Sequence, residues 1–167
     1  MTLYATPSPD QSLDPQPATT TLLTMARALL TVVETSAAGL GIPLPDRRVI
    51  YMAPIPADCP QVAVLVGGWT MDPAGEGMIA CERARWAAQL GIIITRKTPA
   101  VPTAAGDLPT PASMMQAAQL ASDDAEILLE VVGSLQEVAD VLVETPAAEG
   151  GLQSATVSFR TPAFGGI

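Results

Sequence analysis

The chain has 167 residues and a formal net charge of -9, with eight Lys and Arg residues against seventeen Asp and Glu. This length suits one domain with a sizeable core, and a hydrophobic content of 49% excludes a chain that is disordered throughout. The acidic balance argues against a protein that grips phosphates over its whole surface. The sequence shows neither a signal peptide nor an apolar run near the roughly 18 residues of a membrane span. We therefore expect synthesis in the cytoplasm of the producing cell.

The N-terminal part divides into an arm and a helix. Residues 1–18 contain four prolines and no periodic apolar face, which predicts an extended arm. This arm is either a disordered tail or a segment that docks on a neighbouring subunit. Residues 19–38 predict a helix, because apolar residues recur at spacings of three and four. Threonines before Leu22 can cap its start, and glycines at 39 and 41 can end it.

Two strands are expected next. Residues 47–52 form a short strand candidate that is closed by prolines. Residues 61–69 are apolar on both faces and β-branched, which is typical of a central strand. Residues 70–78 predict a turn or a flexible hairpin loop.

Residues 81–97 alternate with a period of two, which predicts a long strand antiparallel to 61–69. A helix over 81–90 is the competing interpretation, because Ala, Arg and Glu favour helices. One face of the strand is apolar and consists of Ala84, Trp86, Ala88, Leu90, Ile92 and Ile94. Arg96 is the next residue on this face and ends it. The other face is polar and basic: Arg83, Arg85, Gln89, Gly91, Thr95, Lys97.

The C-terminal part predicts a loop, a long helix and a last strand. The helix begins with Thr110 as N-cap and Pro111 in its first turn, and residues 134–144 continue it or form a second short helix. Residues 145–151 are expected to be a loop and 152–161 a strand. The fold class is therefore α+β, a mostly antiparallel sheet with helices packed on one face, in a single domain over 19–162 with a tail at 163–167.

Catalytic motifs are absent from the sequence. The chain has no histidine, which excludes Ser-His-Asp and Cys-His nucleophile pairs and histidine metal ligands. Cys59 and Cys81 are expected to be a free, buried, reduced pair, with a disulfide between adjacent strands as the alternative. Asp123 and Asp124 could act as acid and base or hold a metal, but such a run more often lies on a solvated helix face. We expect no enzyme activity, no cofactor and no metal.

The basic residues Arg83, Arg85, Arg96 and Lys97 are half of all Lys and Arg residues in the chain. They could form a solvated strand face, bind nucleic acid, or contact the acidic surface of another copy of the chain. Nucleic-acid binding is the weakest of these interpretations, because the chain has a single Lys and few aromatic residues for stacking. Arginine suits a contact between copies, since its guanidinium pairs with carboxylates through two hydrogen bonds. These four residues are our candidate subunit interface.

The order of the segments resembles that of a known group of phage proteins. The resemblance covers about residues 20–162 and is carried by "PDRRVIYMAP" (45–54), "DCPQVAVLV" (58–66), "CERARWAAQLGIIITRKTPAVP" (81–102) and "ASDDAEIL" (121–128). These segments resemble neck proteins of long-tailed actinobacteriophages, in particular the tail terminators and the neighbouring head-to-tail connectors. The group has no catalytic residues to carry over, and the arm at 1–18 is longer than its pattern requires.

The resemblance implies a virion protein with a tail-terminator-like fold that forms a hexameric ring on the tail tube. Its partners would be the tail tube protein and a head-to-tail stopper or adaptor, with DNA passing through the lumen without specific binding. A stopper or adaptor ring of the same neck is the alternative, and a stopper could plug the lumen with residues 70–78 or 98–109. Other classes also remain open: a cellular module that binds a partner through its long helix, and a hydrolase that uses carboxylates.

Overall fold

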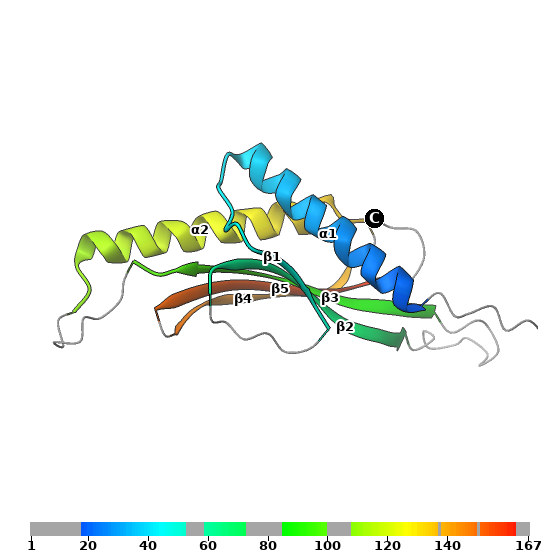
Figure 1. Cartoon of the computed structure of the whole chain (residues 1–167). Helices are drawn as coiled ribbons and strands as arrows, with labels where there is room; N and C mark the ends of the chain where they lie inside the picture. Colours follow the sequence, from blue (N-terminus) through cyan, green and yellow to red (C-terminus); the bar gives the residue numbers. More distant parts are fainter. Residues whose placement is uncertain are drawn as a thin grey trace, which may run out of the picture.

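The computed structural model describes residues 18–52, 59–72, 85–99, 108–136, 138–149 and 151–162. The predicted arm, apart from Ala18, and the predicted tail at 163–167 lie outside these residues. The elements in chain order are α1 (Ala18–Leu40), β1 (Arg48–Tyr51), β2 (Gln61–Asp72), β3 (Arg85–Lys97), α2 (Pro111–Ser134), β4 (Ala139–Glu149) and β5 (Leu152–Pro162) (Figure 1). None of the helices in the described residues is long and apolar enough to cross a membrane.

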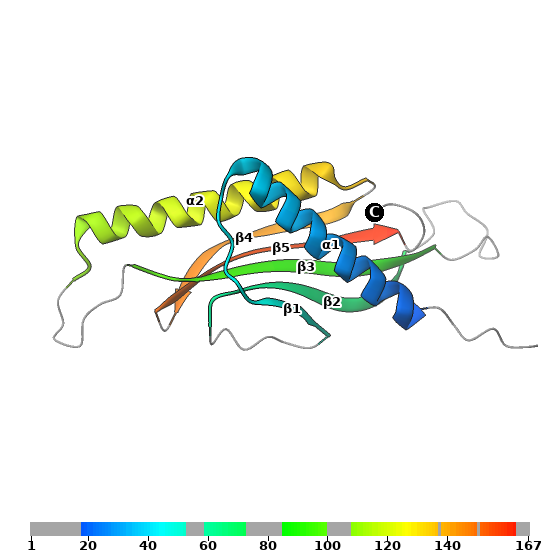
Figure 2. The ribbon, with the colours of Figure 1, turned by 45° about the horizontal axis from the view of Figure 1, so that its top comes forward.

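The strands form one five-stranded sheet in the order β1-β2-β3-β5-β4. β1 pairs with β2 in parallel, and the other three strand pairs are antiparallel. Both helices lie on the same face of the sheet, as the two views show (Figures 1 and 2). Helix α1 contacts β1 and β2, whereas α2 contacts β5 at the other side of the sheet. The predicted α+β class, with a mostly antiparallel sheet and helices on one face, is confirmed.

The core lies between the helices and the sheet. It takes every second residue from the strands and every third or fourth residue from the helices, as the periods of the two structures require. The predicted apolar face of β3 is confirmed from Ala88 to Ile94. The buried cluster consists of Leu22, Ala26, Leu29, Val33 and Ala37 of α1, Val62, Val64 and Val66 of β2, Ala88, Leu90, Ile92 and Ile94 of β3, Ile127, Leu128 and Val131 of α2, and Ala155, Val157 and Phe159 of β5.

The prediction for residues 134–151 was wrong. Helix α2 ends at Ser134, and most of the segment expected to be helix and loop forms β4 instead. The physical reason is pairing with β5, which gives the backbone groups of β4 partners along one edge. Two irregularities interrupt that pairing, between Ala139 and Leu142 and between Glu144 and Ala147. They hide the simple alternation by which a strand is recognised in a sequence.

Most of the predictions for the ends of the helices are confirmed. Thr110 caps α2 by accepting a hydrogen bond from the backbone N–H of Ser113, and Pro111 opens the helix as predicted. The chain leaves α1 through Gly41, whose φ of 70° lies in the left-handed region that favours glycine. The start of α1 differs from the prediction, because the helix begins at Ala18 and the threonines at 19–21 lie inside its first turn.

Candidate functional site

The structure describes three of the four cations of the predicted interface. Arg83 lies outside the described residues, and Arg85 is the first residue of β3, opposite Asp72 in the strand register. Lys97 is exposed at the end of β3. Arg96 points to the helix side of the sheet and is engaged within the chain. The interface role of Arg83, Arg85 and Lys97 therefore stays a prediction, whereas Arg96 already has a partner.

That partner is Asp124 of α2, at a separation of 28 residues in the sequence. The Arg96 Nε lies 2.8 Å and 2.9 Å from the two carboxylate oxygens, and its Nη2 lies 2.7 Å from Oδ1. The two side chains are only 12% and 2% exposed. The prediction that Asp124 lies on a solvated helix face is wrong, because the residue shares the buried face of α2 with Ile127, Leu128 and Val131.

The environment of Asp124 opposes its ionisation. Burial raises the pKa of the carboxyl, and the hydrogen bond and positive charge of Arg96 act in the opposite direction. The negative charge of Asp123 raises the pKa further, and the net direction is upward from the ordinary value of 3.8. The ion pair links α2 to β3.

This shifted pKa predicts a pH dependence of stability. A carboxyl whose pKa is raised in the folded state binds its proton more tightly there than in the unfolded chain. Its contribution to stability is therefore largest below the unfolded-state pKa and is lost as the pH rises through the folded-state pKa. We expect the free energy of unfolding of the wild type, relative to an Arg96→Met/Asp124→Leu variant, to decrease as the pH rises above the ordinary carboxyl pKa of 3.8. Urea titrations of both proteins at several pH values measure this difference, and parallel curves would contradict the prediction.

The other candidate groups also have local roles. The Asp123 carboxylate accepts a hydrogen bond of 2.7 Å from Gln119. Cys59 is a free, half-buried thiol that accepts a hydrogen bond from Arg47, and Cys81 lies outside the described residues. Over the part of the chain that the structure describes, no three His, Cys, Asp or Glu side chains gather where they could hold a metal.

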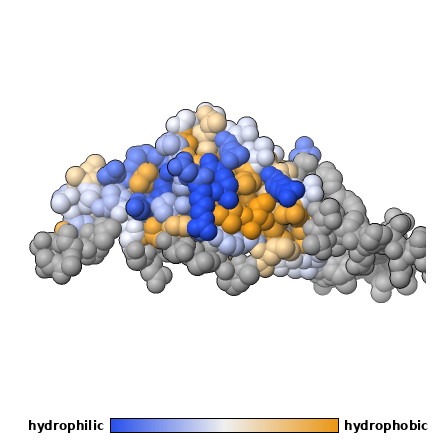
Figure 3. All heavy atoms as spheres, viewed as in Figure 1, coloured by the Kyte–Doolittle hydropathy of each residue, from blue (hydrophilic) through white to orange (hydrophobic). Residues whose placement is uncertain are grey.

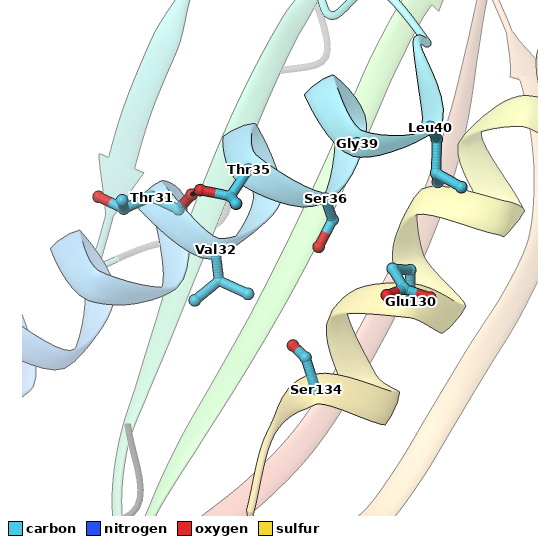
Figure 4. Close-up of a pocket in the computed structure, with 8 residues that line it drawn as sticks. All are labelled: Thr31, Val32, Thr35, Ser36, Gly39, Leu40, Glu130 and Ser134. Atoms are coloured by element: carbon cyan, nitrogen blue, oxygen red, sulfur yellow. Dashed lines mark hydrogen bonds between the residues drawn. The ribbon is translucent and has the colours of Figure 1, made fainter.

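A groove of about 600 Å³ lies between the two helices. From α1 it is lined mainly by small side chains, and Glu130 and Ser134 of α2 complete the lining (Figure 4). Val32 and Ser36 point across the groove towards α2. The groove offers hydroxyl groups and the exposed carboxylate of Glu130.

The β4 side of the sheet presents an exposed apolar run. Val141, Leu142 and Val143 are 43%, 56% and 45% exposed, and Glu144 follows them directly. We call these four residues the β4 flank. Within the described residues, β4 has one strand neighbour, β5, so its other edge is open. An open, apolar edge strand tends to pair or pack with another chain unless something covers it.

The opposite side of the sheet carries basic residues. Arg27 is exposed on α1, two helical turns before Glu34, which accepts a hydrogen bond of 2.8 Å from Arg48 of β1. Leu23, 38% exposed, lies one turn before Arg27 on this side of α1. We call Leu23, Arg27 and Arg47 the β1 flank. Figure 3 shows this side of the molecule, where hydrophobic residues gather next to hydrophilic ones over α1.

The two sides of the molecule therefore differ in charge. Helix α2 and strand β4 contain no Lys or Arg, but they contain Asp123, Asp124, Glu126, Glu130, Asp140, Glu144 and Glu149. Arg96 and Arg160 offset two of these acids, Asp124 and Asp140. Glu126 and Glu144 are exposed and have no ion pair within the described residues. The sheet thus has an acidic end at β4, whereas the end at β1 holds three arginines (Arg27, Arg47 and Arg48) together with Glu34, which pairs with Arg48, and exposed Asp46.

Comparisons with known proteins identify no family. No family model matches the chain, and no curated protein matches it. Among solved structures, the chain is similar to one in a structure described as "Virion of native gene transfer agent (GTA) particle". The TM-score is 0.34 and the sequence identity 12%, over 89% of this chain and 92% of that chain. A likeness at this TM-score carries no argument about function.

Proposed function

We propose that this chain is a structural protein of a phage virion neck: a tail terminator that forms a ring on the tail tube and joins it to the head completion proteins. The sequence resemblance supplies the class of protein. The observation that carries the proposal is the open sheet, in which the exposed apolar residues of β4 and the arginine-bearing β1 side lie at opposite ends. A subunit with unlike ends suits head-to-tail contacts, and such contacts close into a ring when the rotation between copies permits.

The composition also suits a ring through which DNA passes. With a formal net charge of -9, the copies together repel phosphate groups, so DNA moves through the lumen without being held. The same physical properties would serve a stopper or adaptor ring of the neck, which is the second candidate. The proposal assigns the chain no catalytic activity and no cofactor.

The test of this proposal is assembly. We expect the purified full-length chain to form closed rings, hexameric as the resemblance implies, alone or on tubes of the tail-tube protein from the same phage. Native mass spectrometry gives the number of copies, and electron micrographs show whether the rings sit on tube ends. Rings that bind head connectors but ignore tube ends would favour the stopper or adaptor.

Two other outcomes would contradict the proposal. A chain that stays monomeric at high concentration and in the presence of tubes would point to a cellular module that binds a different partner. Turnover of a substrate that is lost on replacing Asp123, or on replacing Asp124 in a variant shown to be folded, would point to a hydrolase.

A further inference from the structure

We infer that copies of this chain meet head to tail, with the β4 flank of one copy packed against the β1 flank of the next. This inference rests on the proposed function and names the two surfaces that its ring would use. The interface candidates expected from the sequence lie on β3 or just before it, whereas these flanks lie at the two ends of the sheet.

The β4 flank is the surface that most needs a cover. Successive side chains of a strand point to opposite faces, so three consecutive exposed apolar residues leave both faces of β4 in contact with water. Val141, Leu142 and Val143 are each more than two-fifths exposed. The irregular pairing of β4 with β5 bends this edge away from an ideal strand, which discourages indiscriminate strand addition but leaves the side chains available to a shaped partner.

The charges select the β1 flank as that partner. Glu144 is the last residue of the β4 flank, and all charged residues of α2 and β4 are acidic. The β1 flank offers Arg27, which is exposed and without an ion pair in the described residues, beside the partly exposed Leu23. The apolar residues of the β4 flank would therefore meet Leu23, and Glu144 would meet Arg27. Arg48 is already paired with Glu34, so Arg27 is the cation that this contact would use.

A two-fold contact between two β4 flanks is disfavoured by the same charges. It would place Glu144 of one copy near Glu144 of the other and bring together two acidic ends of the sheet. Like charges across an interface oppose association. A head-to-tail contact avoids this and leaves one free flank at each end of every intermediate, as ring closure requires.

The experiment uses two variants of the full-length chain, each with one flank disabled by the same chemistry. The β4-flank variant carries Val141→Glu and Leu142→Glu, and the β1-flank variant carries Leu23→Glu and Arg27→Glu. We expect each variant alone to stay monomeric at concentrations about tenfold above those at which the wild type forms rings. Mixed together, they should form a 1:1 dimer and nothing larger, because the pair has one intact contact and two acidic flanks that repel each other.

A matched control is Met115→Glu, which places the same charge on an exposed residue of α2 outside both flanks. This control should form rings like the wild type. Circular dichroism and thermal unfolding show whether each variant is folded, and Arg27→Gln replaces the β1-flank variant if it is not.

The outcomes separate the inference from the proposed function. Rings formed by either folded variant alone, or a mixture without a dimer while the wild type forms rings, would overturn the inference and leave the proposed function standing. A wild type that forms no ring, even with tail tubes, would instead overturn the proposed function.

Discussion

Replacing Arg96 by Met should lower the free energy of unfolding by about 3–5 kcal/mol, the cost of leaving one partner of a buried ion pair uncompensated. The substitution leaves the Asp124 carboxylate, 2% exposed, without the guanidinium that holds both of its oxygens. Asp124→Leu should cost a similar amount, because it leaves the Arg96 charge at a 12% exposed position. Urea unfolding followed by circular dichroism at neutral pH measures both changes.

The double variant Arg96→Met/Asp124→Leu should recover most of this loss, since replacing a whole buried pair by apolar residues is often neutral or stabilising. The matched control is Asp123→Asn, one residue away, which should change the free energy by no more than about 0.5 kcal/mol. Lowering the pH should reduce the cost of Arg96→Met, because the pKa of Asp124 is raised and its protonated form tolerates burial. If Asp124→Leu is as mild as Asp123→Asn, the pair does not stabilise the contact between α2 and β3.

The helices and strand β3 could be predicted because each presents one regularly spaced apolar face to the core. The period of burial then appears directly in the sequence, as in α1 with Leu22, Ala26, Leu29 and Val33, or in β3 with Leu90, Ile92 and Ile94. Capping residues marked the start of α2 equally well, since Thr110 and Pro111 act locally. These signals need no knowledge of distant parts of the chain.

Strand β4 could not be predicted in this way. Its residues Val141, Leu142 and Val143 are all exposed, so no alternation marks a buried face. The Ala, Leu and Glu residues of this segment favour a helix locally. The strand forms because β5 supplies backbone partners after the turn at Gly151, whose φ is 80°. Tertiary pairing therefore decides the structure of a segment whose local preference points elsewhere.

The candidate site also combines features that a local pattern predicts with features that depend on distant parts of the chain. The sequence placed Arg96 at the end of the apolar face of β3, which is where it lies, but its partner is 28 residues away on α2. Asp124 could have been recognised as buried, since Ile127, Leu128 and Val131 follow it at spacings of three, four and seven. The prediction instead followed the general rule that charged residues on a helix face water, which does not hold for Asp124. The exposed flanks required the strand order of the sheet, which no local pattern contains.

Phe159→Ala should destabilise the protein by about 3–5 kcal/mol, the usual range for removing a buried aromatic side chain and leaving a cavity. Phe159 is 1% exposed and lies opposite Leu90 in the register of β5 and β3. It is the one aromatic residue of the buried cluster within the described part of the chain. The small and aliphatic side chains around it can fill its volume only in part.

The matched control is Met115→Ala, at a residue that is 75% exposed, which should change the free energy of unfolding by no more than about 0.5 kcal/mol. Urea titration measures both variants. Because Phe159 is buried and contributes nothing to either flank, the folded fraction of Phe159→Ala should still form the assemblies of the wild type at low temperature. A loss of assembly without a loss of stability would contradict this assignment, since it would mean that Phe159 contacts another copy.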